Sequence, residues 1–128
     1  MMSNNTQPAF GNGKICYMEL PSRDIAESGS FYHQVFQWKI RRRSDGSVAF
    51  DDGIGGVSGT WRTDRIPNTE SGIFVHIMVD DIEETMQKVR AHGGIIVQPV
   101  GMDAPEITAH FLDPSGNLLG LYQHDTRS

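Results

Sequence analysis

Residues 18–38 read MELPSRDIAESGSFYHQVFQW, and residues 75–95 follow the same plan as VHIMVDDIEETMQKVRAHGGI. A constant shift of 57 residues aligns four pairs of matching type: Leu20 with Ile77, Asp24 with Asp81, Ile25 with Ile82 and Glu27 with Glu84. In both copies an apolar stretch leads to an acidic residue and then to a helical pattern. Neither copy can bury its apolar face alone, so the repeat predicts two packed half-domains with a cleft where a small molecule can bind.

Each copy is expected to form a strand, a helix and three further strands. Alternation of apolar and polar residues predicts strands at 14–20, 38–42, 48–51, 55–61, 73–79, 95–98, 107–112 and 118–123. The first helix is expected to begin at Ser22 as N-cap, and the second runs from Ile82 to His92 before Gly93-Gly94. We predict an α+β chain organised as a flexible tail (1–13), a βαβββ module (14–62), a linker (63–71), a second βαβββ module (72–124) and a C-terminal tail (125–128).

The composition limits the classes of partner. The net charge of −5 argues against nucleic acid, because phosphate contacts need an excess of lysine and arginine. No apolar run approaches the roughly 18 residues of a membrane span. Cys16 lies in a strand pattern, where we expect it to be buried, and as the only cysteine it cannot form a disulfide within the chain. This cysteine usage, with a polar start unlike a signal peptide, predicts a reducing, cytoplasmic location.

Several stretches point to one family. They are DIAESGSFY at 24–32 with VFQW at 35–38, VDDI at 79–82 with Gly93-Gly94, and the turn DPSGN at 113–117. Together with the repeated βαβββ plan, they resemble the vicinal oxygen chelate superfamily of glyoxalase I, extradiol dioxygenases, fosfomycin-resistance transferases and bleomycin-sequestering proteins. The resemblance covers residues 14–123. It implies modules whose sheets curl into a U-shaped, half-open, barrel-like cleft around a small-molecule ligand, in a homodimer.

The resemblance also indicates where metal ligands would lie. Metal-dependent members carry them on the strands that line the U, at the positions that are Tyr17, Phe74 and Gly120 here. Only the phenol could bind a metal, and Zn²⁺ and Ni²⁺ seldom use it. The remaining ligand strand, at 55–58, offers no carboxylate or imidazole. We therefore predict no metal ligands and no cofactor, with a divalent metal as the alternative.

Two ionisable residues are predicted to share the cleft. If Tyr17 faces it, strand alternation places Glu19 there too, and Phe74 brings His76 and Met78 in the same way. Glu19 and His76 occupy matching places in the repeat, so a pseudo-twofold axis would set a carboxylate opposite an imidazole, as a catalytic acid/base pair requires. The alternative is that Glu19 accepts a hydrogen bond from an arginine or the backbone and that His76 is a structural strand histidine.

Eight residues are predicted to contact the ligand: Tyr17, Trp38, Ser58, Trp61, Phe74, Met78, Gly120 and Tyr122. The aromatic members could stack on a planar compound or belong to the core. Arg41-Arg42-Arg43 could hold an anion, but a solvated strand edge is favoured. His110 faces the cleft in one strand register and solvent in the other.

Two functional classes follow. In the first, a glyoxalase-related lyase, isomerase or transferase uses Glu19 and His76 to move a proton while Tyr17 holds a substrate oxygen. In the second, the protein sequesters a hydrophobic or planar compound without metal, as bleomycin-resistance proteins do. An accessory or regulatory role is neither supported nor excluded, and the sequence does not identify the ligand.

Overall fold

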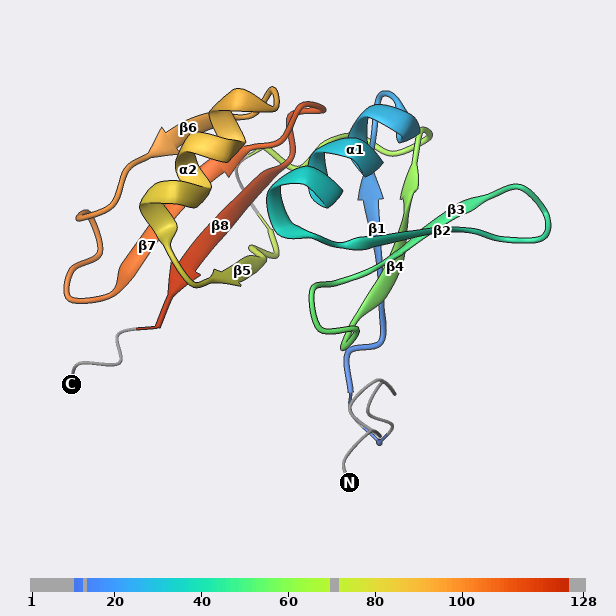
Figure 1. Ribbon diagram of the computed structural model, residues 1–128, viewed down its shortest axis with the longest axis horizontal. Helices are drawn as coiled ribbons and strands as arrows, with labels where there is room; N and C mark the ends of the chain where they lie inside the picture. The colour runs from blue at the N-terminus through green and yellow to red at the C-terminus, as the bar shows by residue number, and fades with distance from the viewer. Residues whose placement is uncertain (1–10, 13, 70–71, 125–128) are drawn as a thin grey trace. The chain divides into compact units, whose positions relative to one another are not determined.

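The computed structural model describes residues 11–12, 14–69 and 72–124, so most of both predicted tails lies outside the described residues. The chain divides into two compact units, Met1–Arg65 and Ile66–Ser128, and the division falls inside the predicted linker. Each unit contains one helix and one four-stranded sheet (Figure 1).

The first unit contains β1 (Tyr17–Pro21), α1 (Ile25–Phe36), β2 (Lys39–Arg42), β3 (Val48–Asp51) and β4 (Ser58–Arg62). Its sheet has the order β1-β4-β3-β2. The first and last strands, β1 and β4, pair in parallel, and the other pairs are antiparallel.

The second unit repeats this arrangement with β5 (His76–Val79), α2 (Ile82–Ala91), β6 (Ile95–Gln98), β7 (Ile107–Leu112) and β8 (Leu118–Gln123). Its order is β5-β8-β7-β6, again with a parallel pair between the first and last strands. The α+β fold with two βαβββ modules is confirmed, and both sheets are open. Strands β1, β4 and β5 are shorter than predicted. A cleft shared by the two modules stays a prediction.

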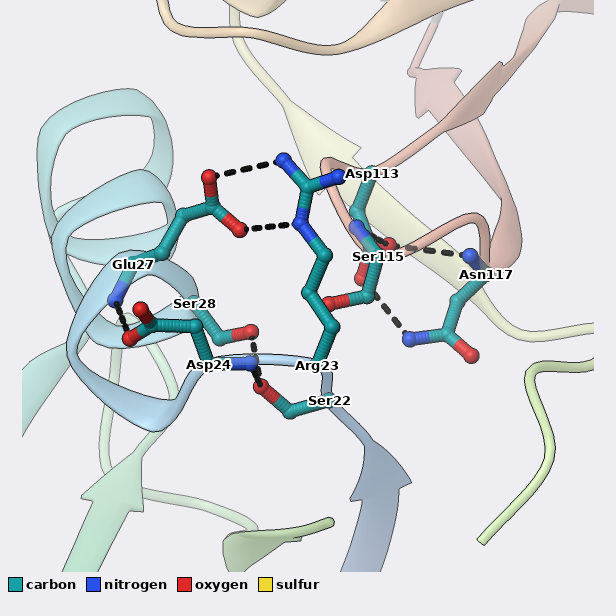
Figure 2. Close-up of polar contacts among 8 residues, drawn as sticks. All are labelled: Ser22, Arg23, Asp24, Glu27, Ser28, Asp113, Ser115 and Asn117. Carbon is teal, nitrogen blue, oxygen red and sulfur yellow. Dashed lines mark hydrogen bonds and ion pairs between the residues drawn. The ribbon is translucent and has the colours of Figure 1, made fainter.

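The repeated aspartates explain why both helices begin where they do. The side chain of Asp24 accepts a hydrogen bond from the Glu27 N–H at 3.0 Å, and Asp81 accepts one from Glu84 at 3.1 Å (Figure 2 shows the first). Each carboxylate thereby satisfies a backbone donor that the first turn leaves free. The prediction that Ser22 is the N-cap is wrong.

Ser22 instead fixes the chain before the helix. Its buried hydroxyl lies 2.6 Å from the hydroxyl of Ser28 and accepts a hydrogen bond from the Asp24 N–H at 3.1 Å (Figure 2). The predicted turn at 113–117 is confirmed in the second unit. There the carboxylate of Asp113 accepts hydrogen bonds from the backbone N–H groups of Ser115 and Asn117 at 3.0 and 2.9 Å.

Each helix packs its apolar side on one face of its own sheet. In the first unit an aromatic cluster forms this core, with Trp38 stacked between Tyr32 and Phe50 at ring-centroid distances of 4.5 and 4.6 Å. In the second unit, the core consists of Ile82, Met86 and Val89 of α2 with Ala109, Phe111, Leu119 and Leu121 of the sheet. Cys16, expected to be buried, is exposed because it precedes β1 instead of lying within it. No helix among the described residues is long and apolar enough to cross a membrane.

Candidate functional site

The face of each sheet that lies away from its helix carries polar and ionisable side chains. In β1 and β4 of the first unit, Leu20 and Trp61 point to the helix and are buried, whereas Tyr17 and Glu19 alternate to the other face and are exposed. The strand register places Ser58 beside Tyr17 and Thr60 beside Glu19. We call this helix-free side the open face of the first sheet.

The open face of the second sheet is defined by the same alternation. Its members include Phe74, His76, Met78, Gln98, Thr108, His110, Gly120 and Tyr122. The register pairs Gly120 with His76 on one side and with His110 on the other. His110 therefore lies on the same face as His76, which settles the orientation that strand periodicity left open.

His76 sits directly on the glycine of the neighbouring strand. A Cβ atom added at Gly120 would lie 2.5 Å from Cδ2 and 2.7 Å from Nε2 of the His76 ring. The ring of Phe74 lies 4.7 Å from that of His76 and 4.6 Å from that of His110, centroid to centroid, and the two imidazoles are 6.2 Å apart. The absence of a side chain at Gly120 thus provides the space for an imidazole and aromatic cluster.

His110 is the more enclosed of the two imidazoles. Burial lowers its pKa, the carboxylate of Asp103 opposes that effect, and His76 reinforces it. Asp103 is itself held by the hydroxyl of Thr108, which donates to it at 2.6 Å. A lowered pKa favours the neutral ring, which has one nitrogen free to accept a hydrogen bond.

This environment predicts a pH dependence of stability. The unfolded chain protonates His110 near the ordinary pKa of 6.5, whereas the folded protein does so only at lower pH. The stabilisation is therefore present above about pH 6.5 and is lost as the pH falls below it. We expect His110→Gln to reduce the loss of unfolding free energy between about pH 7.5 and 5.5, measured by urea denaturation. Parallel pH curves for wild type and variant would contradict this.

The residues at the family's metal positions offer few atoms that could bind a divalent metal. Tyr17 offers a phenol, Phe74 offers only a phenyl ring, and at Gly120 the ring of His76 fills the place of a side chain. In the described part of the chain, no group of three or more His, Cys, Asp or Glu side chains could hold a metal ion. The absence of a metal stays a prediction, and the residue types at these positions support it.

Glu19 is engaged by arginines of its own unit. Nη2 of Arg65 donates to the Glu19 carboxylate at 2.9 Å, and Nη1 of Arg62 lies 3.7 Å from it. This arrangement corresponds to the alternative in which Glu19 accepts a hydrogen bond from an arginine. The opposition of Glu19 and His76 across a cleft stays a prediction.

Two further arginines on the open face of the first sheet have different partners. Arg41 forms a two-pronged ion pair with Asp51, at 2.7 and 2.9 Å. This contact lowers the pKa of Asp51 to about 2, with help from the hydroxyl of Ser58 and against the effect of burial. Arg43 instead donates through Nη2 to the hydroxyl oxygen of Tyr17 at 2.6 Å.

The predicted ligand-contact residues fall into two groups. Six lie on the open faces: Tyr17, Ser58, Phe74, Met78, Gly120 and Tyr122. Trp38 and Trp61 are only 5% and 3% exposed and belong to the aromatic core, which favours a structural role for both. Their contact with a ligand stays a prediction. Sequence reasoning did not select His110 or Arg43, because their positions depend on strand order and pairing.

Two tandem βαβββ modules, each with a helix on one face of an open sheet, define the fold class. A family model described as the Glyoxalase/Bleomycin resistance protein/Dioxygenase superfamily matches residues 14–121. The chain belongs to this superfamily.

Individual relatives are distant. A glyoxylase-like domain-containing protein of Didymella fabae is 27% identical over 122 residues, which cover 83% of this chain and 90% of the relative. A glyoxalase/bleomycin resistance protein/dioxygenase family enzyme from Burkholderia phytofirmans has a TM-score of 0.66 and 19% identity, covering 87% of this chain and 98% of its own. The fosfomycin resistance protein FosX of Mesorhizobium loti has a TM-score of 0.67 and 14% identity, covering 91% and 96%. At these identities the solved structures establish the fold alone.

Proposed function

We propose that this protein binds a small molecule on the open faces of its sheets without the divalent metal typical of glyoxalase-like relatives. The observation that supports the proposal is the packing of the His76 ring on Gly120, where an added Cβ atom would lie 2.5 Å from Cδ2 of the imidazole. A carboxylate at that position would need the space that the imidazole occupies. The site that remains is an aromatic and imidazole surface, suited to stacking and hydrogen bonding with a planar compound.

Exposure of apolar side chains supports a ligand on this surface. Phe74 is 37% exposed and Met78 is 70% exposed, beside the half-buried Tyr122. An aromatic ring and a flexible thioether on one face offer contact area that adapts to a hydrophobic or planar ligand. Sequestration of such a compound, with no chemical step, is the form of the proposal that these side chains favour.

Metal content and ligand binding test this function together. Protein purified without chelator should contain zinc, nickel, iron and manganese well below one equivalent per chain, and chelator should leave ligand binding unchanged. A ligand at ten times its dissociation constant should add about 1.4 kcal/mol to the free energy of unfolding, with no product formed. One tightly held metal equivalent that is needed for binding would contradict the proposal.

Proton transfer is the second candidate, favoured by the closeness of two imidazoles on one face. His76 and His110 lie 6.2 Å apart, and a histidine beside a bound substrate can accept or donate a proton near neutral pH. In this version Glu19 is the acidic partner of His76, and the protein is a glyoxalase-related lyase or isomerase. His76→Ala and Glu19→Gln should then each abolish turnover or shift its pH profile in folded protein. Unchanged kinetics in both variants would exclude the pair.

We also propose that the protein acts as a homodimer in the cytoplasm, with a small molecule and not nucleic acid as its ligand. The negative net charge of −5 supports the last point. Sedimentation equilibrium at several protein concentrations should give twice the chain mass of 14.2 kDa. A single species at the mass of one chain would contradict the dimer.

A further inference from the structure

Arg43 and Tyr17 meet across the whole width of the first sheet. Tyr17 belongs to β1 and Arg43 directly follows β2, and these two strands are the opposite edges of the order β1-β4-β3-β2. Three strand spacings of about 4.8 Å separate them. Yet Nη2 of Arg43 donates to the Tyr17 hydroxyl at 2.6 Å, and the guanidinium carbon lies 5.8 Å from the centre of the phenol ring. The two side chains therefore extend over the open face, above β4 and β3.

Arg43 differs in charge balance from the other arginines of this face. Arg41 is paired with Asp51, whereas Arg62 and Arg65 are paired with Glu19 and Asp64. Among the described residues, no carboxylate forms an ion pair with Arg43, and its hydrogen-bond partner is a neutral phenol.

Asp45, an acidic residue two positions from Arg43 in the sequence, has other hydrogen-bond partners. The carboxylate of Asp45 accepts hydrogen bonds from the backbone N–H and the hydroxyl of Ser47, at 2.9 and 2.7 Å. It is close enough for the charge of Arg43 to contribute to the lowered pKa of Asp45, but it forms no ion pair with the guanidinium. Arg43 thus brings a positive charge to the open face that no contacting carboxylate of the described residues neutralises.

The contact leaves donors available for a ligand. A guanidinium has five N–H donors, and the bond to Tyr17 uses one of them. The phenol oxygen accepts that bond, so its own proton remains to be donated. A cationic fork beside a hydroxyl donor is a suitable arrangement for the two oxygens of a carboxylate or for a phosphonate-type group.

We propose that Arg43 and Tyr17 bind the anionic group of the ligand, a carboxylate or a similar oxyanion on a compact organic molecule. The inference rests on the proposed function, because it names the chemical class of a compound that binds to the open face of the first sheet. It also gives Tyr17, at a position where relatives carry a metal ligand, a role in anion recognition.

The test compares probes of matched shape and different charge. Benzoate and benzamide have nearly the same size, but only benzoate is an anion, and phenylphosphonate distinguishes a phosphonate from a carboxylate. Binding of each probe to the full chain is measured by titration calorimetry and by thermal shift at low and high salt. Wild type should bind at least one of the two anions about tenfold or more tightly than benzamide. The preference should shrink as salt screens the charge.

Arg42, the last residue of β2, supplies a matched control. It is the neighbouring arginine, it points to the other face, and its Nη1 donates to the carbonyl of Gly46. Arg43→Gln should reduce the preference for the anion to near onefold, whereas Arg42→Gln should leave it unchanged. Tyr17→Phe keeps the ring and removes the hydroxyl, so it should weaken binding of the anion about threefold to tenfold and leave binding of benzamide unchanged.

The outcomes separate this inference from the proposed function. Equal binding of the anions and benzamide to wild type would overturn the anion site and leave small-molecule binding intact. An anion preference that survives Arg43→Gln, or that Arg42→Gln removes equally, would also overturn it. Absence of saturable binding of all three probes at high millimolar concentration would contradict the anion site, and the measurements of metal content and ligand binding described above then decide the proposed function.

Discussion

Replacing Gly59 with alanine is expected to destabilise the first unit by about 3 kcal/mol or more. A Cβ atom at this position would overlap the carbonyl oxygen of Met18 and the tip of the Phe50 ring, and would lie 2.8 Å from Cε2 of that ring. Neither neighbour can move away easily. Met18 lies in the β1 strand that pairs with β4, and Phe50 is fully buried between Trp38 and Trp61 at ring-centroid distances of 4.6 and 4.8 Å.

Tryptophan fluorescence during urea denaturation measures this effect, because both tryptophans of the chain lie in the first unit. Gly29→Ala is the control. Its Cβ would make ordinary contacts at 3.8 and 3.9 Å with Ile40 and Trp61, and alanine in a helix is favoured over glycine by about 0.5–1 kcal/mol. We expect Gly29→Ala to stabilise the fold. A Gly59→Ala midpoint equal to that of wild type would contradict the tight packing of β1, β3 and β4.

The duplicated fold could be predicted because its signals are local. An aspartate that caps a helix, an apolar stripe along that helix and a turn such as 113–117 each act over a few residues. The same signals recur in both halves, so Asp24 and Asp81 take equivalent N-cap positions. Strand alternation likewise predicted that Tyr17 and Glu19 share one face of the first sheet. It predicted in the same way that Phe74, His76 and Met78 share one face of the second sheet.

The errors arose where a local signal had two interpretations. Ser22 and Asp24 are both good N-cap residues, and the choice depends on the burial of Ser22 against Ser28. Trp38 and Trp61 are not among these errors: they lie in the aromatic core, and their contact with a ligand stays a prediction. Cys16 fits the alternation of apolar and polar residues that predicted the first strand, but β1 itself begins only at Tyr17.

The arginine contacts of the first sheet could not be predicted from the sequence. Arg43 and Tyr17 are 26 residues apart, and their contact depends on the order β1-β4-β3-β2 and on the length of an arginine side chain. The sequence indicates only that alternate residues of Arg41-Arg42-Arg43 share a face. His110 is similar, because its face became defined only through its pairing with Gly120.

Gly120→Ala should have the largest effect on ligand binding through the second sheet. The new Cβ would collide with Cδ2 and Nε2 of His76, at 2.5 and 2.7 Å. Because His76 is an exposed side chain, it can rotate away, so we expect a loss of stability of about 1–2 kcal/mol, less than for Gly59→Ala. The displaced imidazole should lose its contact with Phe74, and ligand affinity should fall by about tenfold or more. Imidazole resonances in NMR spectra report the displacement, and titration calorimetry reports the affinity.

A double-mutant cycle separates displacement of His76 from any other effect of the methyl group. In a His76→Ala background the collision is absent, so Gly120→Ala should cost little stability and change affinity little further. The difference between the two backgrounds should be about 1 kcal/mol in unfolding free energy. An equal cost in both backgrounds would mean that Gly120 is required for a reason other than seating His76, and the main support for a metal-free site on this face would be lost.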